Sequence, residues 1–273
     1  MKTYINLGCG ERTHPDWLNV DLTAGKSDVL KYDLTTGVPF PSDRADAVYC
    51  AAVLEHFRRQ NVAQFLKEIY RVLKPGGVIR VGVPDLEKLC QIYLEKLQAA
   101  LAGDERAVPD YDWILLEMFD QAVRERSGGE MLAYLAQEKL PNESFVLARI
   151  GNEGRELIAS IRRARMHHQP SLLRRLRSFT KTIRDQVAKV LAGRDGHRAL
   201  EIGRFRLSGE AHHWMYDRFS LRRELERAGF REARICTPTE SSIADWDRFQ
   251  LDVDSQGRPH KPDLFFMEAI KPR

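Results

Sequence analysis

The sequence has few cysteines, and their spacing does not suggest a metal site or a disulfide framework. Its 273 residues include Cys9, Cys50, Cys90 and Cys236, and no two of these stand in a C-x-x-C arrangement. Structural zinc sites and disulfide-stabilised domains normally use close pairs. We therefore expect four reduced thiols and no metal centre, a pattern typical of a cytoplasmic protein.

Long apolar runs and a targeting pattern are also missing from the sequence. No apolar run approaches the roughly 20 residues that a membrane-spanning helix needs. The first residues lead almost directly into an apolar run at Tyr4–Leu7, without a charged region followed by an apolar one. We therefore expect no signal peptide and a cytoplasmic location.

The charge balance is mild, and the apolar content is that of a folded protein. The net charge is +4, which is too small to argue for nucleic-acid binding by itself. Hydrophobic residues make up 43% of the chain and charged residues 30%, so the chain can bury a core and is not a disordered protein. The length suits one large domain or two small ones.

Strand-like and helix-like patterns alternate over the first 90 residues. Short apolar runs at Tyr4–Leu7, Trp17–Leu22, Asp46–Cys50 and Val78–Val83 read as strands, and Gln60–Leu73 has the period of an amphipathic helix. This alternation predicts a mostly parallel α/β sheet.

The alternation stops after the fourth strand and returns near the end of the chain. A helix is expected at Phe219–Gly229, followed by strands at Arg231–Thr237 and Leu264–Ile270. We therefore expect a core of residues 1–98 plus 205–273, and a helical insertion at 99–204. An insertion at this point would lie over the carboxyl ends of the strands, as an acceptor-side lid.

A glycine turn and two acids point to a nucleoside site. Gly8 and Gly10 follow the first strand, where glycine permits positive φ and close approach of a ligand. Asp21 ends the second strand and Asp33 lies at the next strand end, so the two carboxylates suit a ribose and an adenine. The alternative is that both acids are helix caps or turn residues.

The usual dinucleotide fingerprint is absent. No third glycine opens a helix after Gly10, and Asp21 follows too soon, so the first helix is very short or missing. Without a helix N-terminus the site lacks the usual anchor for a pyrophosphate. This favours a nucleoside ligand without phosphates, such as S-adenosylmethionine (SAM), over NAD.

Several short motifs, in this order, resemble those of class I SAM-dependent methyltransferases. They are Asn6-Leu7-Gly8-Cys9-Gly10, Asn19-Val20-Asp21, Tyr32-Asp33-Leu34, Val38-Pro39-Phe40, Asp46-Ala47-Val48, Val53-Leu54-Glu55-His56-Phe57 and Tyr70 to Gly77. Residues 212–217 and the helix after them are similar to a small bacterial subgroup found among surface-polysaccharide and glycan genes. The resemblance implies a Rossmann-like sheet, mostly parallel with the last strand antiparallel.

The resemblance also implies roles for individual residues. The glycine turn would face the methionine part of SAM, Asp21 the ribose, and Asp33 the adenine. The complete cofactor-binding set would be Gly8, Cys9, Gly10, Asp21, Leu22, Asp33, Leu34 and Ala51. One departure is Asn6, where many members of the family have an acid, although an amide still offers an acceptor oxygen.

Methyl transfer to a hydroxyl requires a group that takes up the proton. Candidates near the strand ends are Glu55, His56 and His212. His213, which follows His212 in the sequence, is a further candidate. For His56 the alternative is a helix residue packed under the sheet edge. Trp214 and Tyr216 could be core aromatics or a platform for a sugar ring.

Two functions remain open. The first is an enzyme that O-methylates a glycan, a sugar or a related small molecule, and the second is a non-catalytic SAM-binding or scaffold subunit. In addition, residues 171–192 form an amphipathic helical pattern with arginines on one face, among them Arg174, Arg175 and Arg177. This helix could dock on the core, lie on an anionic membrane at the inner membrane surface, or bind an acidic partner. No RNA-binding module is recognisable, so nucleic acid ranks last.

Overall fold

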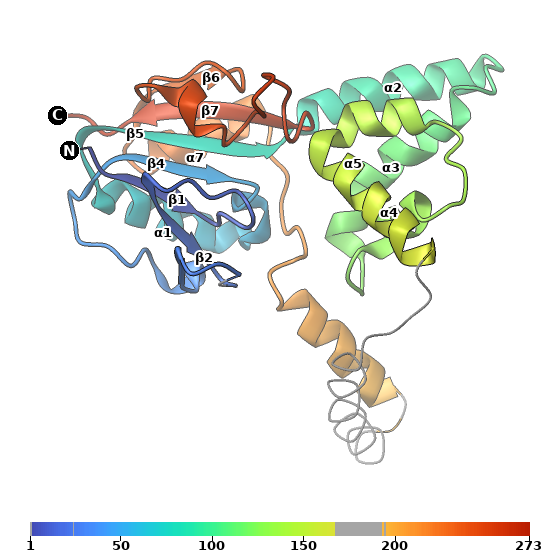
Figure 1. Cartoon of the computed structure of the whole chain (residues 1–273), viewed down its shortest axis with the longest axis horizontal. Helices are drawn as coiled ribbons and strands as arrows, with labels where there is room; N and C mark the ends of the chain where they lie inside the picture. The colour runs from blue at the N-terminus through green and yellow to red at the C-terminus, as the bar shows by residue number, and fades with distance from the viewer. Residues whose placement is uncertain (1, 24, 167–192, 194) are drawn as a thin grey trace.

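The computed structural model describes residues 2–23, 25–166, 193 and 195–273. A seven-stranded sheet forms one part of the molecule, and a group of helices lies beyond the carboxyl end of β5 (Figure 1). The strands are β1 (Tyr4–Leu7), β2 (Trp17–Asp21), β3 (Val29–Lys31), β4 (Ala45–Ala51), β5 (Leu73–Pro84), β6 (Arg231–Cys236) and β7 (Leu264–Ile270).

The strand order is β3-β2-β1-β4-β5-β7-β6. The pairs from β3 to β5 are all parallel, whereas β7 runs antiparallel to both of its neighbours. This confirms the expected Rossmann-like sheet, mostly parallel with the last strand antiparallel. The strands β2 and β3 lie on one side of β1, and β4 lies on the other side. At such a reversal of strand order a crevice opens at the carboxyl ends of the two central strands, β1 and β4.

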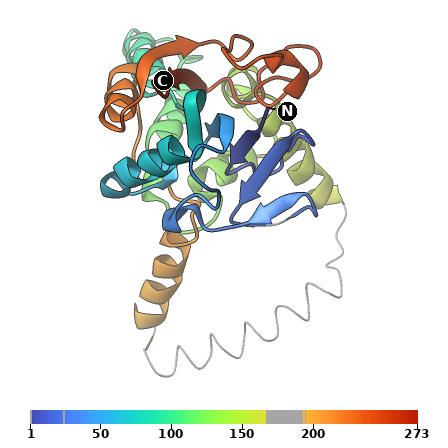
Figure 2. The ribbon, with the colours of Figure 1, turned by 90° about the vertical axis from the view of Figure 1, so that its left-hand side faces the viewer.

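Two helices cover one face of the sheet. They are α1 (Arg59–Val72) and α7 (Arg218–Arg227), which lie on the same side of the strands (Figures 1 and 2). Buried side chains of α1, among them Phe65, Leu66 and Ile69, pack on the sheet in the main core. α7 begins with a capping box in which Asp217 accepts hydrogen bonds from the first turn.

The opposite face of the sheet is covered by the segment between β6 and β7. Trp17 and Tyr49 from the strands pack there against Trp246 and Phe249 of the short helix η3 (Trp246–Phe249). This aromatic cluster replaces a covering helix. It brings the residues that follow η3 to the carboxyl ends of the strands.

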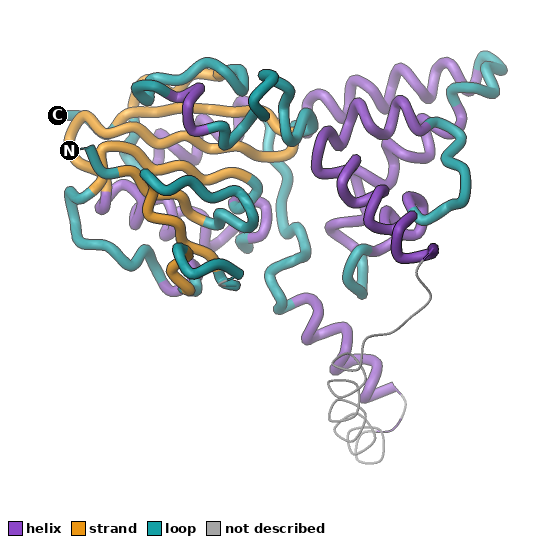
Figure 3. The backbone as a smooth tube through the Cα atoms, in the orientation of Figure 1, coloured by secondary structure: helices purple, strands orange, loops and turns teal. Residues whose placement is uncertain are grey.

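Four helices after β5 pack around a second apolar cluster that includes Trp113, Ile114 and Val146 (Figure 3). They are α2 (Leu86–Leu101), α3 (Val108–Val123), α4 (Gly129–Leu135) and α5 (Glu143–Met166). Helix α5 has a kink at Gly151, where φ is 61°. A further helix spans 195–206, and the chain then returns to α7.

The local predictions agree with the structure in most places. No helix separates β1 from β2, as expected, and the strand ends at Leu7, Asp21 and Ile270 are confirmed. The helix expected to reach Leu73 ends one residue earlier, because Leu73 already pairs with Ala45 and opens a longer β5. The basic helix expected at 171–192 lies outside the described residues. Among the residues that are described, no helix is long and apolar enough to cross a membrane.

Candidate active site

The glycine turn at the end of β1 is fixed by the neighbouring strand. The amides of Gly8 and Cys9 both donate to the Val20 carbonyl, at 2.8 and 3.1 Å. Gly8 has φ +67°, and a Cβ built there would lie 2.3 Å from Val53 Cγ2. Both the backbone conformation and the close approach of Val53 therefore require glycine at position 8.

The two strand-end aspartates bind the local backbone and also face one cavity. Asp21 Oδ2 accepts from the Gly10 amide at 2.9 Å, and Oδ1 accepts from the amide and hydroxyl of Thr23. Asp33 Oδ1 accepts from the amide of Thr35 at the start of η1 (Leu34–Thr36). The cap and turn contacts considered for these acids are thus present. Both residues nevertheless line the same cavity as the glycine turn.

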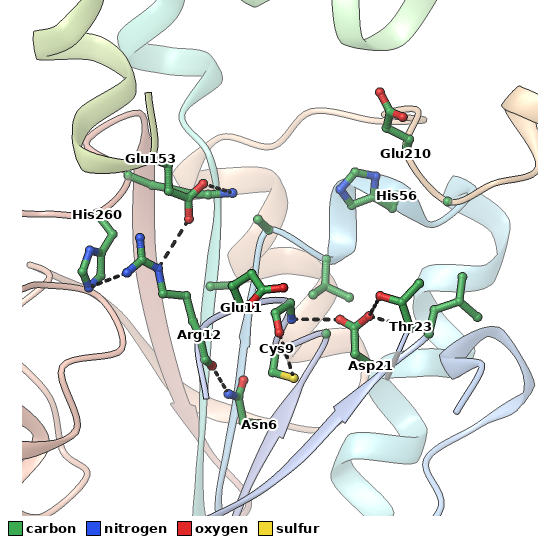
Figure 4. Close-up of a pocket in the computed structure, with 18 of the residues that line it drawn as sticks. Asn6, Cys9, Glu11, Arg12, Asp21, Thr23, His56, Glu153, Glu210 and His260 are labelled. Atoms are coloured by element: carbon green, nitrogen blue, oxygen red, sulfur yellow. Dashed lines mark hydrogen bonds and ion pairs between the residues drawn. The ribbon is translucent and has the colours of Figure 1, made fainter. Parts of the chain in front are cut away.

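This cavity has a volume of about 1090 Å³ and lies at the carboxyl ends of β1, β2 and β4 (Figure 4). All of the residues expected to bind the cofactor line it: Gly8, Cys9, Gly10, Asp21, Leu22, Asp33, Leu34 and Ala51. The structure therefore brings together a set chosen from the sequence, while the role of each residue stays a prediction. Pockets for a single small ligand are commonly about 300–1,000 Å³, so the cavity leaves room beyond one cofactor.

The residues present fit an adenosyl sulfonium ligand with an amino-acid tail. Asn6 is buried at the cavity, its amide nitrogen donates to the Arg12 carbonyl at 2.7 Å, and its Oδ1 has no partner among the described residues. A buried oxygen without a partner is unfavourable, and the ammonium group of SAM, directly or through water, would satisfy it. The carboxylates of the half-buried Asp21 and the exposed Asp33 offer acceptors for the hydroxyl and amino groups of adenosine.

The other part of the cavity is lined by polar side chains from distant segments. From α5 come Glu153, Glu156, Ser160 and Arg163, and from the segment before β7 come His260 and Lys261. Glu153 lies 3.6 Å from the Arg12 guanidinium and 3.3 Å from Lys261 Nζ, and Arg12 also approaches His260 at 3.3 Å (Figure 4). These residues were missed from the sequence, because no local pattern signals contacts between segments so far apart.

The three catalytic candidates lie together in one cluster. Glu55 and His56 belong to the short helix η2 (Leu54–His56) after β4, and His212 precedes α7. One ligand-type atom from each of the three side chains lies within 4.8 Å of the others. The rings of His56 and His212 meet edge to face, with centroids 4.8 Å apart. Of the three, His56 lines the cavity.

Burial controls the charge of this cluster. Loss of hydration raises the pKa of Glu55 to about 7. Loss of hydration also lowers the pKa of His56 to about 4 and that of His212 to about 3. The nearby Lys261 and Arg124 cations lower both pKa values further, and His56 adds to the lowering at His212. Both imidazoles are therefore neutral at physiological pH, and each carries one nitrogen lone pair.

The neighbours of this cluster have other roles. His213 is half-buried, and its amide donates to the Glu55 carbonyl. Tyr216 is a core residue, 2% exposed. Trp214 is 40% exposed, and the Arg59 guanidinium lies 4.5 Å from its ring centre. Trp214 and Tyr216 line a smaller groove at α7 rather than the large cavity, so neither of them serves as an aromatic platform in that cavity.

A family model described as "Methyltransferase domain" matches residues 6–81, which include the glycine turn, both aspartates and η2. A search of curated proteins finds no match. The domain match and the sheet order together support a class I SAM-dependent methyltransferase with a Rossmann-like fold, and SAM as its cofactor.

Solved methyltransferase structures are similar to this chain at a low level. A SAM-dependent methyltransferase of Thermotoga maritima is 13% identical, with 99% of this chain and 83% of that chain covered at a TM-score of 0.39. One of Archaeoglobus fulgidus is 11% identical, with 99% and 86% covered at 0.39. Human N-acetylserotonin methyltransferase in complex with SAM is 11% identical, with 99% and 48% covered at 0.38. At these TM-scores the substrate of a similar protein cannot be assigned to this chain.

Proposed function

We propose that this protein is a SAM-dependent methyltransferase that O-methylates a sugar, a glycan or a related hydroxylated small molecule. The observation that carries the proposal is the composition of the cavity at the carboxyl ends of the strands. One part is bounded by the glycine turn, Asp21 and Asp33, and the other by carboxylate, hydroxyl and cationic side chains of α5 and the β7 approach. Polar side chains of this kind, set among apolar residues of the same cavity, suit an acceptor that is itself rich in hydrogen-bonding groups.

Each part of the cavity would hold one substrate. Bound SAM supplies a methyl group on a positively charged sulfur. Asp21 and Asp33 would orient the adenosine, and Asn6 Oδ1 would accept from the ammonium end. Glu156 and Ser160 on α5 would hold acceptor hydroxyls. Transfer requires the acceptor oxygen to stand in line with the methyl group, at about 3–3.5 Å, so the main contribution of these residues is positioning.

The cluster of Glu55, His56 and His212 is the candidate for handling the hydroxyl proton. It reaches the cavity through His56, and the three groups lie within 4.8 Å of one another. This arrangement supports an enzyme rather than the alternative, a non-catalytic SAM-binding or scaffold subunit. A subunit that only binds SAM has no need of space and polar groups beyond the cofactor.

The test has two stages, binding and transfer. Calorimetry should show that SAM and S-adenosylhomocysteine both bind. Incubation with methyl-labelled SAM and a panel of nucleotide sugars and glycans should then give labelled product with at least one acceptor, detected by mass spectrometry. Binding without transfer to any acceptor of the panel would favour the scaffold alternative. Absence of SAM binding would overturn both.

The helix expected at residues 171–192 is tested separately, since it lies outside the described residues. Sedimentation with anionic vesicles at low salt should capture the protein if this segment contacts a membrane at the inner membrane surface. Replacement of Arg174, Arg175 and Arg177 by glutamate should then abolish capture. No capture of the unchanged protein at low salt would remove the membrane interpretation and leave docking on the core or an acidic partner.

A further inference from the structure

We propose that Glu55, His56 and His212 form a binding site for a divalent transition-metal ion of the zinc class. Each side chain offers one ligand atom, and these atoms lie within 4.8 Å of one another. Two imidazole nitrogens and one carboxylate oxygen are a recurrent ligand set for zinc at sites with an open position. The sequence analysis expected no metal centre, because the three residues come from separate segments and share no spacing motif.

The backbone around the cluster is already held in place. The Glu55 carbonyl accepts from the amides of His213, at 2.6 Å, and Trp214, at 3.4 Å. The His212 amide donates to the Gln121 carbonyl of α3 at 2.9 Å. These contacts fix η2 against the segment that carries His212. The side chains therefore meet without any ion, and a metal would find a formed site.

One carboxylate oxygen of Glu55 lacks a hydrogen-bond partner. The residue is 1% exposed, and its Oε2 has no hydrogen-bond partner in the described part of the chain. The nearby cations have carboxylates of their own: Lys261 lies 3.3 Å from Glu153, and Arg124 lies 3.4 Å from Glu210. A buried carboxylate oxygen without a partner is costly. A metal ion bound between Glu55 and the two histidines would supply the missing positive charge.

The hydrogen bond of His56 prepares its ring for a metal. Nδ1 lies 3.3 Å from the Ala211 carbonyl, which can only accept, so Nδ1 carries the proton in the neutral ring. Nε2 is then the nitrogen with the lone pair. Metal-binding histidines commonly donate their second nitrogen to an oxygen in this way, which fixes the ring orientation.

The ligand types select the class of metal. Imidazole nitrogens suit zinc and neighbouring transition metals, whereas magnesium and calcium prefer oxygen ligands alone. Ligands about 2.0–2.2 Å from one ion lie within roughly 4 Å of one another. The ion would therefore draw the side chains slightly closer together than they stand in the structure.

The site has a consequence for catalysis that rests on the proposed function. Three protein ligands leave a position that a substrate oxygen could take. The acceptor hydroxyl would lose its proton to solvent, its oxygen would form the bond to the methyl carbon, and the S–CH₃ bond would break, with its electron pair left on sulfur. A cation at His56 would stabilise the negative charge that develops on that oxygen.

The binding experiment uses the full chain, stripped of metal with a chelator and titrated with Zn²⁺ alone in a calorimeter. We expect one ion per chain and at least a tenfold preference over Mg²⁺. Replacing Glu55 by glutamine (E55Q) or His212 by asparagine (H212N) should weaken Zn²⁺ binding by at least roughly tenfold. His213→Asn is the matched control, since it changes a histidine of the same segment outside the cluster, and its Zn²⁺ affinity should equal that of the unchanged protein.

Further measurements make the outcome decisive. Circular dichroism and SAM affinity show whether each variant is folded, and Co²⁺ in place of Zn²⁺ should give visible absorption bands that E55Q and H212N lose. Equal Zn²⁺ affinity in the folded variants and the unchanged protein, or no preference over Mg²⁺, would overturn the metal site. Methyl transfer that survives metal removal would overturn its catalytic part, while SAM binding and product formation would still uphold the proposed function.

Discussion

The Gly10 amide donates a 2.9 Å hydrogen bond to Asp21 Oδ2, which ties the glycine turn after β1 to the end of β2. The carboxylate expected to receive the ribose therefore also shapes the turn expected to receive the methionine part of SAM. The second oxygen holds the amide and hydroxyl of Thr23. The Asp21 side chain thus holds both the turn at Gly10 and the segment at Thr23, which line the cofactor part of the cavity.

Replacing Asp21 by alanine should weaken SAM binding by about 1–3 kcal/mol, or roughly 5- to 150-fold. The loss has two sources, since the ribose loses an acceptor and the Gly10 amide loses its partner. Calorimetric titration with SAM measures the effect. Asp16→Ala is the control, because Asp16 pairs with Arg248 outside the cavity, and its affinity should be unchanged. An unaltered affinity in Asp21→Ala would show that this strand end does not hold the cofactor.

Replacing Gly8 by alanine should abolish measurable SAM binding. The added methyl group would stand 2.3 Å from Val53 Cγ2 and would also require alanine at φ +67°. Gly103→Ala is the matched control, because Gly103 also has positive φ, +88°, but has open space around it and lies outside the cavity. Both variants should lose about 1 kcal/mol of stability or more from backbone strain. Only Gly8→Ala should lose the ligand, and equal binding by the two variants would refute the close-approach role of Gly8.

The cofactor part of the cavity could be predicted from the sequence because its signals are local. A strand followed by glycines, and an aspartate at the end of the next strand, are each visible within a few residues. The parallel sheet then places these ends at one edge. Asp21 and Asp33 could be assigned to a common edge in this way, although their cap and turn contacts could not be separated from a ligand role.

The acceptor part could not be predicted, because it depends on packing between distant segments. Glu153 reaches Arg12 and Lys261 only because α5 lies beyond the strand ends, and no periodicity encodes that placement. His56 and His212 were each candidates, yet their edge-to-face contact follows from the path of the segment before α7. The start of β5 at Leu73 was also missed, since its pairing with Ala45 overrides the helical pattern.

The Cys9 thiol in the cofactor wall should react slowly and with a steep pH dependence. Burial, together with the Asp21 carboxylate, raises the pKa of Cys9 to about 11. The reactive thiolate is therefore scarce at pH 8, and its fraction should rise about tenfold between pH 8 and pH 9, against about threefold for an unperturbed thiol of pKa about 8.5. Alkylation with iodoacetamide, followed by peptide mass spectrometry, measures the rate. The unfolded chain provides the threefold reference, and a threefold rise in the folded protein would contradict the raised pKa.

The aromatic cluster around Trp246 should depend on Arg80, a cation fully buried in the middle of β5. Its guanidinium lies 2.8 Å from Asp252 and 2.9 Å from Glu268, and it donates to the Thr237 and Glu240 carbonyls of the segment that covers this face. Replacing Arg80 by methionine keeps the bulk but leaves the buried Asp252 without a cation, and it leaves Glu268 with only the half-exposed Arg234 as its cationic partner. Removal of one partner from a buried ion pair typically costs about 3–5 kcal/mol.

Chemical denaturation of Arg80→Met should therefore show a loss of about 3–5 kcal/mol in the free energy of unfolding. Arg248→Ala is the matched control, because Arg248 also pairs with an aspartate, Asp16 at 2.6 Å, but both side chains are about half exposed. That surface pair should contribute about 1 kcal/mol or less. Since Leu251 and Asp252 line the large cavity, loosening this segment should also weaken ligand binding. A loss in Arg80→Met no greater than that in Arg248→Ala would mean that the aromatic cluster alone holds the segment on the sheet.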